Sequence, residues 1–144
     1  MDATYPLPHV TLDWLKDRAN GYLPGEIGVE PVEVGNGRLV ARLDIEKRHV
    51  APNGYLHAAT VIALADTTCG YATLAHLPPH GHSFTTIELK SNHLGTATEG
   101  AIRATATARH LGGKTHVWDA DVTREIDGKV IALFRCTQMI LNAK

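Results

Sequence analysis

The chain has 144 residues, of which 44% are hydrophobic and 20% charged, and its formal net charge at pH 7 is −1. This length favours one domain, 1–144, with a core that folds without metal or disulfide cross-links. The balanced charge argues against a nucleic-acid partner or an anionic membrane surface. Cys69 and Cys136 lie in apolar segments and are expected to be free thiols. Because the sequence opens without a basic and apolar leader, the expected location is cytoplasmic.

The first part of the chain is expected to form a short helix followed by a hairpin. Residues 11–20 carry apolar side chains at helical spacing, with Thr11 placed to serve as the N-cap. A turn is predicted at 22–25. Two strands are predicted at 26–34 and 38–46, because the Gly-Asn-Gly between them is a strong hairpin signal.

The longest apolar segment predicts a buried central helix at about 57–75. From residue 58 to 75 every side chain is apolar or small and polar, except that of Asp66. A helix that is apolar on all sides is normally buried. The Ala and Thr content and the carboxylate argue against a transmembrane helix. The Pro-Pro pair that follows ends the helix.

Four strands joined by hairpin turns are expected after the helix, at 83–93, 100–110, 115–124 and 129–141. In the first of them, positions 85, 87, 89 and 91 are expected to share one face. One long apolar helix needs a sheet to cover it, so the predicted class is α+β, with a curved antiparallel sheet wrapped around one long central helix. This pattern is similar to the hot-dog fold.

Asp66 is the leading candidate for chemistry. A buried carboxylate is costly and usually remains because it is paired or because it acts in catalysis. It can act as a general base or a nucleophile. The structural alternatives are an ion pair with a buried Arg and a contact with a partner subunit. Asn53 and His57 are either orienting groups or, equally, a turn residue and a helix cap.

The start of the central helix offers unpaired backbone N–H groups, which can stabilise an oxyanion. Gly54 and the small residues near it allow a ligand to approach the backbone. From His57 to Asp66 the helix rises roughly 12–14 Å, so one chain cannot bring both to the same atom. Two antiparallel helices across a dimer would bring one helix start near the other Asp66, which indicates a shared site.

Other catalytic classes lack their motifs. The nine histidines form no HExxH pattern, and the chain has no CxxC, so no metal is expected. A GxSxG nucleophile elbow is absent from the sequence, and the Gly-Gly pair at 112–113 lacks the strand–GxGxxG–helix context of a nucleotide site.

Three stretches resemble the hot-dog thioesterases of the phenylacetate-degradation type. They are NGYLH at 53–57 with Asp66 nine residues after the His, TIELKSNHLGTA at 86–97, and GKVIALFRCT at 128–137. This resemblance implies hydrolysis of an acyl- or aryl-CoA thioester to a free acid and CoA. It implies no cofactor besides the coenzyme A of the substrate. It also implies a homodimer or homotetramer with active sites at the dimer interface.

The resemblance assigns roles to individual residues. Asp66 becomes the catalytic carboxylate, as nucleophile or as base on water, and the backbone N–H of Ala58 polarises the thioester carbonyl. Asn53 and His57 complete the catalytic set. Thr86 matches a position that faces the site from the opposite subunit. The implied substrate-binding residues, with coenzyme A meeting the 109–114 turn, are Gly54, Thr86, Asn92, Arg109, Gly113 and Lys114.

Two departures from the family pattern affect the helix start. The usual His-Gly-Gly is His-Ala-Ala at 57–59, and the position of the family's orienting Asn or Gln is Ala51, with Asn53 two residues later. Two other functions stay open. One is a hydratase or dehydratase of acyl thioesters with His57 as base and Asp66 as partner. The other is a non-catalytic acyl-CoA-binding protein, which the two alanines leave open.

Overall fold

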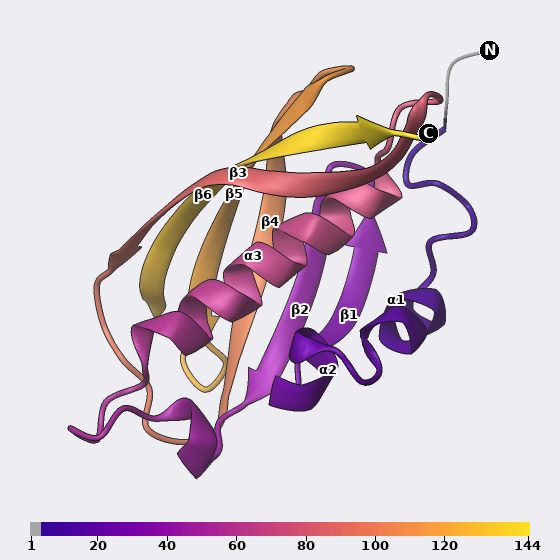
Figure 1. Cartoon of the computed structure of the whole chain (residues 1–144). Coiled ribbons are helices and arrows are strands. Elements are labelled where there is room, and N and C mark those ends of the chain that lie inside the picture. Colours follow the sequence, from indigo (N-terminus) through magenta and orange to yellow (C-terminus); the bar gives the residue numbers. More distant parts are fainter. Residues whose placement is uncertain (1–3) are drawn as a thin grey trace.

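The computed structural model of the chain describes residues 4–144, in which a six-stranded antiparallel sheet curves around one long helix (Figure 1). The strands are ordered β1-β2-β4-β5-β6-β3. This confirms the expected α+β class with a central helix. In chain order the elements are α1 (Leu12–Ala19), α2 (Leu23–Ile27), β1 (Glu30–Gly35), β2 (Arg38–Asp44), the 3₁₀ turn η1 (Lys47–His49), α3 (Ala58–Ala75), β3 (Gly81–His93), β4 (Ala101–Leu111), β5 (Thr115–Arg124) and β6 (Val130–Asn142).

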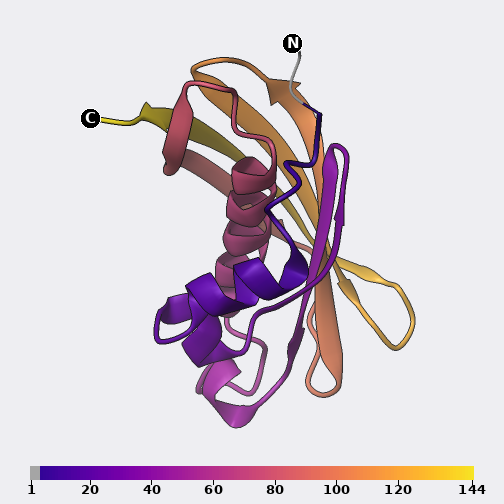
Figure 2. The same cartoon turned by 90° about the vertical axis from the view of Figure 1, so that its right-hand side faces the viewer.

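Helix α3 lies along the concave face of the sheet, with α1 and α2 beside it on the β1 side (Figure 2). Its bounds confirm the predicted central helix. Leu64, Ala65, Cys69 and Ala72 are fully buried between helix and sheet. By length and composition α3 could cross a membrane, but most of it is buried inside the fold as a core helix. Both cysteines are free and buried, as predicted.

The N-terminal segment contains one helix that the sequence pattern did not indicate. The Thr11 side chain caps α1 by accepting a hydrogen bond from the Trp14 N–H, as predicted. Instead of the predicted turn and early strand, α2 follows, and β1 begins only at Glu30. Pro24 suits the first turn of a helix, and Gly28, with φ of 87°, ends it in the left-handed conformation.

The predicted meander is right for β4, β5 and β6 and wrong for β3. The hairpins β4–β5 and β5–β6 connect neighbours, and β1–β2 turns at the Gly-Asn-Gly as expected. Strand β3, however, pairs with β6 at the far edge of the sheet. The connection from β3 to β4 therefore crosses the sheet and is not a hairpin. Strand β3 leaves the C-terminal end of α3, and this position next to β6 is a long-range feature that turn signals do not encode.

A β-bulge in β3 changes which side chains face α3. The pairing with β6 shifts between Thr86 and Glu88. Phe84 and Thr86 face the helix before the bulge, whereas Leu89 and Ser91 are paired with buried residues of β6 after it. An extra residue in a strand reverses the alternation beyond it. The prediction that 85, 87, 89 and 91 share one face is therefore wrong.

Gly70 of α3 packs directly against the Phe84 ring of β3. A Cβ atom at position 70 would lie 2.7 Å from the ring Cζ. We expect Gly70→Ala to lower the free energy of unfolding by about 1 kcal/mol, since overpacking costs about 1–3 kcal/mol and helix propensity returns about 1. Urea denaturation measures this change. In a Phe84→Leu background the smaller side chain should make the same substitution stabilising, and an equal loss in both backgrounds would contradict the packing.

Candidate active site

Asp66 lies in the middle of α3, half-buried, on the helix face that meets β3. The Thr86 hydroxyl lies 3.1 Å from Asp66 Oδ1. Within residues 4–144 no Arg, Lys or His pairs with this carboxylate. The alternative of a buried Arg–Asp66 ion pair is therefore not what the chain forms.

The surroundings of Asp66 disfavour its charge. Burial raises the pKa of the Asp66 carboxyl, and the hydrogen bond from Thr86 lowers it to a smaller extent by stabilising the charged form. The pKa of Asp66 is higher in the folded protein than in the unfolded chain. The free energy of unfolding therefore falls as the pH rises from the unfolded-state pKa to the folded-state pKa, and it stays at the lower value at higher pH. A carboxylate kept at a cost to stability is typical of a functional site.

His57 caps the start of α3 with its side chain. Its Nδ1 accepts a hydrogen bond of 2.9 Å from the Ala59 N–H. The Ala58 N–H makes no hydrogen bond within the described part of the chain, and Ala58 is exposed. The Ala58 N–H is therefore available as a donor, and its role in polarising the thioester carbonyl stays a prediction. Since the Nδ1 lone pair of His57 is already engaged, His57 is poorly prepared to act as a base.

A buried histidine that the sequence analysis did not single out holds the helix start in place. The Nδ1 of His49 accepts the Glu46 N–H at 2.9 Å, and its Nε2–H donates to the Ile27 carbonyl at 2.7 Å. The His49 carbonyl accepts hydrogen bonds from the Thr60 hydroxyl and the His57 N–H. The side chain and the carbonyl of one residue thus tie α2 and η1 to α3. The contact with Ile27 spans 22 residues of sequence and no local motif indicates it, whereas the contact with Glu46 is part of a local capping box.

The loop before α3 is closed by its own hydrogen bonds. The Ala51 N–H donates to the Tyr55 carbonyl, and the Gly54 N–H donates to the Ala51 carbonyl. Gly54 has a φ of 89°, which a side chain would strain. The Asn53 Oδ1 accepts the Tyr55 N–H at 3.2 Å, as in an Asx turn. Asn53 therefore serves the turn, and its orienting role in catalysis stays a prediction.

The substrate-binding residues predicted by resemblance fall into separate places. Thr86 bonds to Asp66 of its own chain, whereas the resemblance implies that it serves the opposite subunit. Asn92 lies on the outer face of the sheet with Lys90 and Arg135, away from α3. Within one chain, Asp66 and Thr86 come together and Asn92 does not join them.

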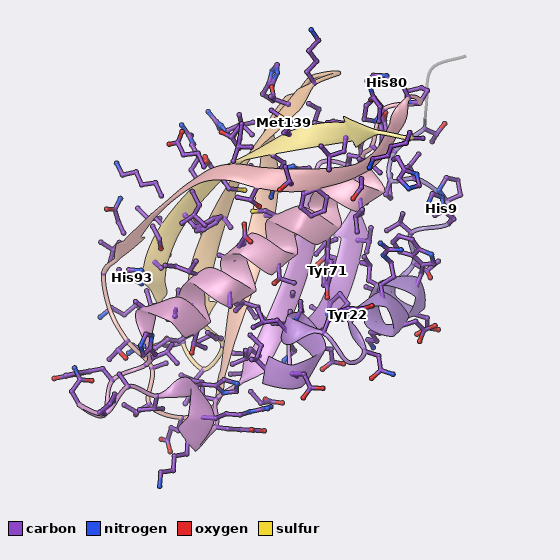
Figure 3. The ribbon with its side chains drawn as sticks, viewed as in Figure 1. His9, Tyr22, Tyr71, His80, His93 and Met139 are labelled. Atoms are coloured by element: carbon purple, nitrogen blue, oxygen red, sulfur yellow. The ribbon has the colours of Figure 1, made fainter. Side chains whose placement is uncertain are left out.

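The 109–114 turn lies toward the C-terminal end of α3. Arg109 forms an exposed ion pair of 3.6 Å with Asp119. The Gly113 carbonyl lies 2.7 Å from Nε2 of His80, which precedes β3 at one end while His93 marks the other (Figure 3). Lys114 is exposed. This hairpin makes no hydrogen bond or ion pair with Asp66 within the described residues, and its contact with coenzyme A stays a prediction.

Gln138 is a site residue whose function the sequence analysis missed. It is fully buried on β6, and its side-chain amide lies 2.7 Å from the Thr86 hydroxyl. The only sequence signal is a polar residue that interrupts the mostly apolar last strand. The Ser91 Oγ on β3 is also buried and has no hydrogen-bond partner within the described residues.

The cavities described in one chain do not contain Asp66. One of about 540 Å³ lies beside Trp14 and Leu77, and one of about 570 Å³ lies beside Arg124. Over residues 4–144, no group of three His, Cys, Asp or Glu side chains is placed to hold a metal ion. The carboxylate is thus presented on a helix face and not inside a finished pocket.

Comparison with known proteins assigns the family. Residues 53–131, more than half of the chain, match the Thioesterase superfamily. The chain belongs to this superfamily. A 1,4-dihydroxy-2-naphthoyl-CoA hydrolase of Listeria monocytogenes is 33% identical to it over 111 residues, which are 77% of this chain and 89% of that protein.

Solved thioesterase structures agree with this assignment. A thioesterase of Pseudomonas aeruginosa, solved as a variant with one Gln replaced by Ala, matches with a TM-score of 0.90 and 25% identity over 98% of this chain and 100% of that one. The PaaI protein from the phenylacetic acid degradation operon of Escherichia coli has the same fold, with a TM-score of 0.78 and 22% identity over 91% and 94%. The hot-dog fold and the thioesterase resemblance are confirmed, and the chain is a thioester hydrolase.

The cap on α3 gives a stability prediction. His57→Ala should lower the free energy of unfolding by about 1 kcal/mol, because the Ala59 N–H loses its acceptor. His57→Asn should keep most of the stability, since Asn is a favourable N-cap. Thermal and urea unfolding of the three proteins measure the difference. Equal destabilisation by Asn and Ala would mean that the imidazole matters for something other than capping.

Proposed function

We propose that this thioesterase hydrolyses an acyl- or aryl-CoA thioester, with Asp66 supplying or activating the attacking oxygen. One observation carries the proposal: a half-buried carboxylate without a cationic partner in the described residues, held by the Thr86 hydroxyl, in the core helix of a thioesterase-superfamily chain. The name of the Listeria monocytogenes relative supports coenzyme A as the thiol part of the substrate.

The proposed reaction divides the work between the carboxylate and a helix start. Thr86 holds Oδ1, which leaves Oδ2 open. Oδ2 either attacks the thioester carbon, giving an acyl-enzyme anhydride that water cleaves, or removes a proton from a water that attacks. The carbonyl oxygen becomes an oxyanion and accepts a hydrogen bond from an Ala58 N–H at the positive end of α3. The C–S bond then breaks, and the CoA thiolate leaves and takes up a proton.

A second copy of the chain would complete this site. His57 and Asp66 are separated by roughly 12–14 Å of helix, so the donor and the carboxylate must come from two subunits. Strand β3 is a sheet edge of 13 residues, and Ile87 and Leu89 on it are exposed. Such an edge is a template for pairing. A two-fold axis at β3 would set the two α3 helices antiparallel, with one helix start near the other Asp66. Assembly into a homotetramer stays a further prediction.

The same arrangement gives the 109–114 turn a role. In an antiparallel pair, the C-terminal end of one α3 lies near the start of the other. Lys114 and Arg109 would then be available to the phosphates of coenzyme A bound at that start. The ion pair of Arg109 with Asp119 is exposed and therefore weak enough to exchange for a phosphate contact.

The two alternative functions make different predictions. Hydratase chemistry needs His57 as a base, but its Nδ1 already caps the helix. A non-catalytic binding protein would bind CoA esters without turnover. Release of free thiol supports hydrolysis, a change in enoyl absorbance supports hydration, and tight binding without either supports the binding protein.

Replacement of Asp66 tests the catalytic assignment. We expect Asp66→Asn to keep the fold and to lower kcat by about 10²–10⁴-fold, because the attacking oxygen or its base is lost. Thiol release from acetyl-, hexanoyl-, benzoyl- and phenylacetyl-CoA measures the effect. Asp121→Asn, on an exposed position of β5, is the matched control and should be fully active. Mass spectrometry checks that the Asn has not deamidated to Asp. Full activity of such a folded Asp66→Asn protein would contradict the catalytic assignment.

A charge on the β3 edge tests the shared site. Ile87→Lys should convert the dimer to monomers and abolish most hydrolysis, since it puts a cation on the pairing edge. Light scattering after gel filtration gives the mass, and circular dichroism checks the fold. Ile126→Lys, which changes a more exposed Ile in the β5–β6 turn, should leave both mass and activity unchanged. A folded, monomeric and fully active Ile87→Lys protein would rule out a site shared between subunits.

A further inference from the structure

Beneath Asp66, a row of polar side chains runs from the helix across β3 to β6. Asp66 Oδ1 lies 3.1 Å from the Thr86 hydroxyl, which lies 2.7 Å from the Gln138 amide, and that amide lies 3.5 Å from the Cys136 sulfur. Gln138 is fully buried and Cys136 nearly so. A buried amide in a core strand is costly unless it is hydrogen-bonded.

The hydrogens of this row determine how it works. The Thr86 hydroxyl carries a single hydrogen, so it cannot donate both to Asp66 and to an amide oxygen. A half-turn of the Gln138 amide exchanges its oxygen and nitrogen and moves no other heavy atom. With the nitrogen toward Thr86, the amide N–H donates to the hydroxyl oxygen, and the hydroxyl hydrogen points at Asp66. The amide oxygen then accepts the Cys136 S–H. In this orientation the Thr86 hydroxyl, the amide N–H that faces it and the Cys136 thiol each have an acceptor.

We infer that Gln138 is a positioning residue for the thioesterase reaction, which aims the Thr86 hydroxyl at Asp66 Oδ1 and so leaves Oδ2 turned toward the substrate. Gln138 touches no reacting atom. By donating to the Thr86 oxygen, Gln138 fixes the rotation of the Thr86 hydroxyl, whose hydrogen could otherwise point at more than one acceptor. This inference rests on the proposed function, because it assigns Gln138 a task only if Asp66 is the catalytic carboxylate.

Among the titratable groups around this row, Asp66 is the one whose ionised form the row stabilises. Cys69 on α3 lies close to Cys136, and burial raises the pKa of the Cys69 thiol. His116 on β5 is paired across the strands with Gln138, and burial lowers its pKa to about 4, so it is neutral above that pH. The Thr86 hydrogen bond stabilises ionised Asp66 and lowers its pKa. Loss of that bond should therefore move the acid limb of the pH–rate profile to higher pH.

Four variants test the positioning role with the fastest-hydrolysed ester of the four-member CoA panel. Thr86→Val and Gln138→Met should each lower kcat/KM by about tenfold, the size expected for one hydrogen bond to a charged group, with the larger part in kcat. Both should move the acid limb to higher pH. Thr86→Ser keeps the hydroxyl and should have the original rate and the original position of the acid limb. Thr73→Val removes a fully buried hydroxyl of α3, bonded to the Cys69 carbonyl, and should change neither.

The double variant Thr86→Val/Gln138→Met decides whether Gln138 acts through Thr86. If it does, the double variant should be no slower than Thr86→Val alone, whereas independent effects would multiply to about a hundredfold. Multiplied effects, or a Gln138→Met protein with the original rate and acid limb, would overturn the inference. Should Gln138→Met fail to fold, Gln138→Leu takes its place. An active Asp66→Asn protein would instead defeat the proposed function, so the two failures are distinguishable.

Discussion

The structure depends on the burial of a helix that has no polar face. Helix α3 is apolar or small along its length, and the curved sheet covers the side that carries Leu64, Cys69 and Ala72. Its first turns, including Ala58 and Ala59, are left exposed. Burial of apolar surface is the main favourable term in folding and in most association. The same requirement that folds the sheet around α3 therefore favours covering its remaining side with a second copy.

Asp66 works against that requirement, and the surrounding residues show how the fold tolerates it. Charge on Asp66 is opposed by burial and supported by one hydroxyl. The hydroxyl in turn is held by a buried amide on β6. The burial of Asp66 thus lowers the stability of the fold, and the hydrogen bonds of the small polar network behind it offset part of that cost. A carboxylate held in this way reacts more readily than one that is solvated or paired with a cation.

The sequence predicted those parts of the fold and site that local signals define. The bounds of α3, the Thr11 cap and the hairpins with Gly turns follow from residues close together in the chain. Asp66 stood out for the same reason, as one charge in an apolar run. Two features were not predicted, because they depend on contacts between segments far apart in the chain. They are the position of β3 beside β6 and the bulge after Thr86. Because the alternation reverses at the bulge, periodicity alone does not show that Thr86 faces α3 and meets Gln138.

In the proposed reaction, the departures at the helix start place more of the chemistry on Asp66. By resemblance, Ala51 stands where the family has its orienting amide, and the Ala51 backbone is engaged in a closed turn. The Asn53 oxygen serves that turn, and the His57 ring serves the cap. In the proposed reaction the oxyanion is therefore stabilised by backbone donors and the helix dipole, without a dedicated side chain. In that proposal, more of the rate comes from an attacking oxygen that is desolvated and correctly turned, and the polar row of Asp66, Thr86 and Gln138 is the part of the proposed site that one chain supplies by itself.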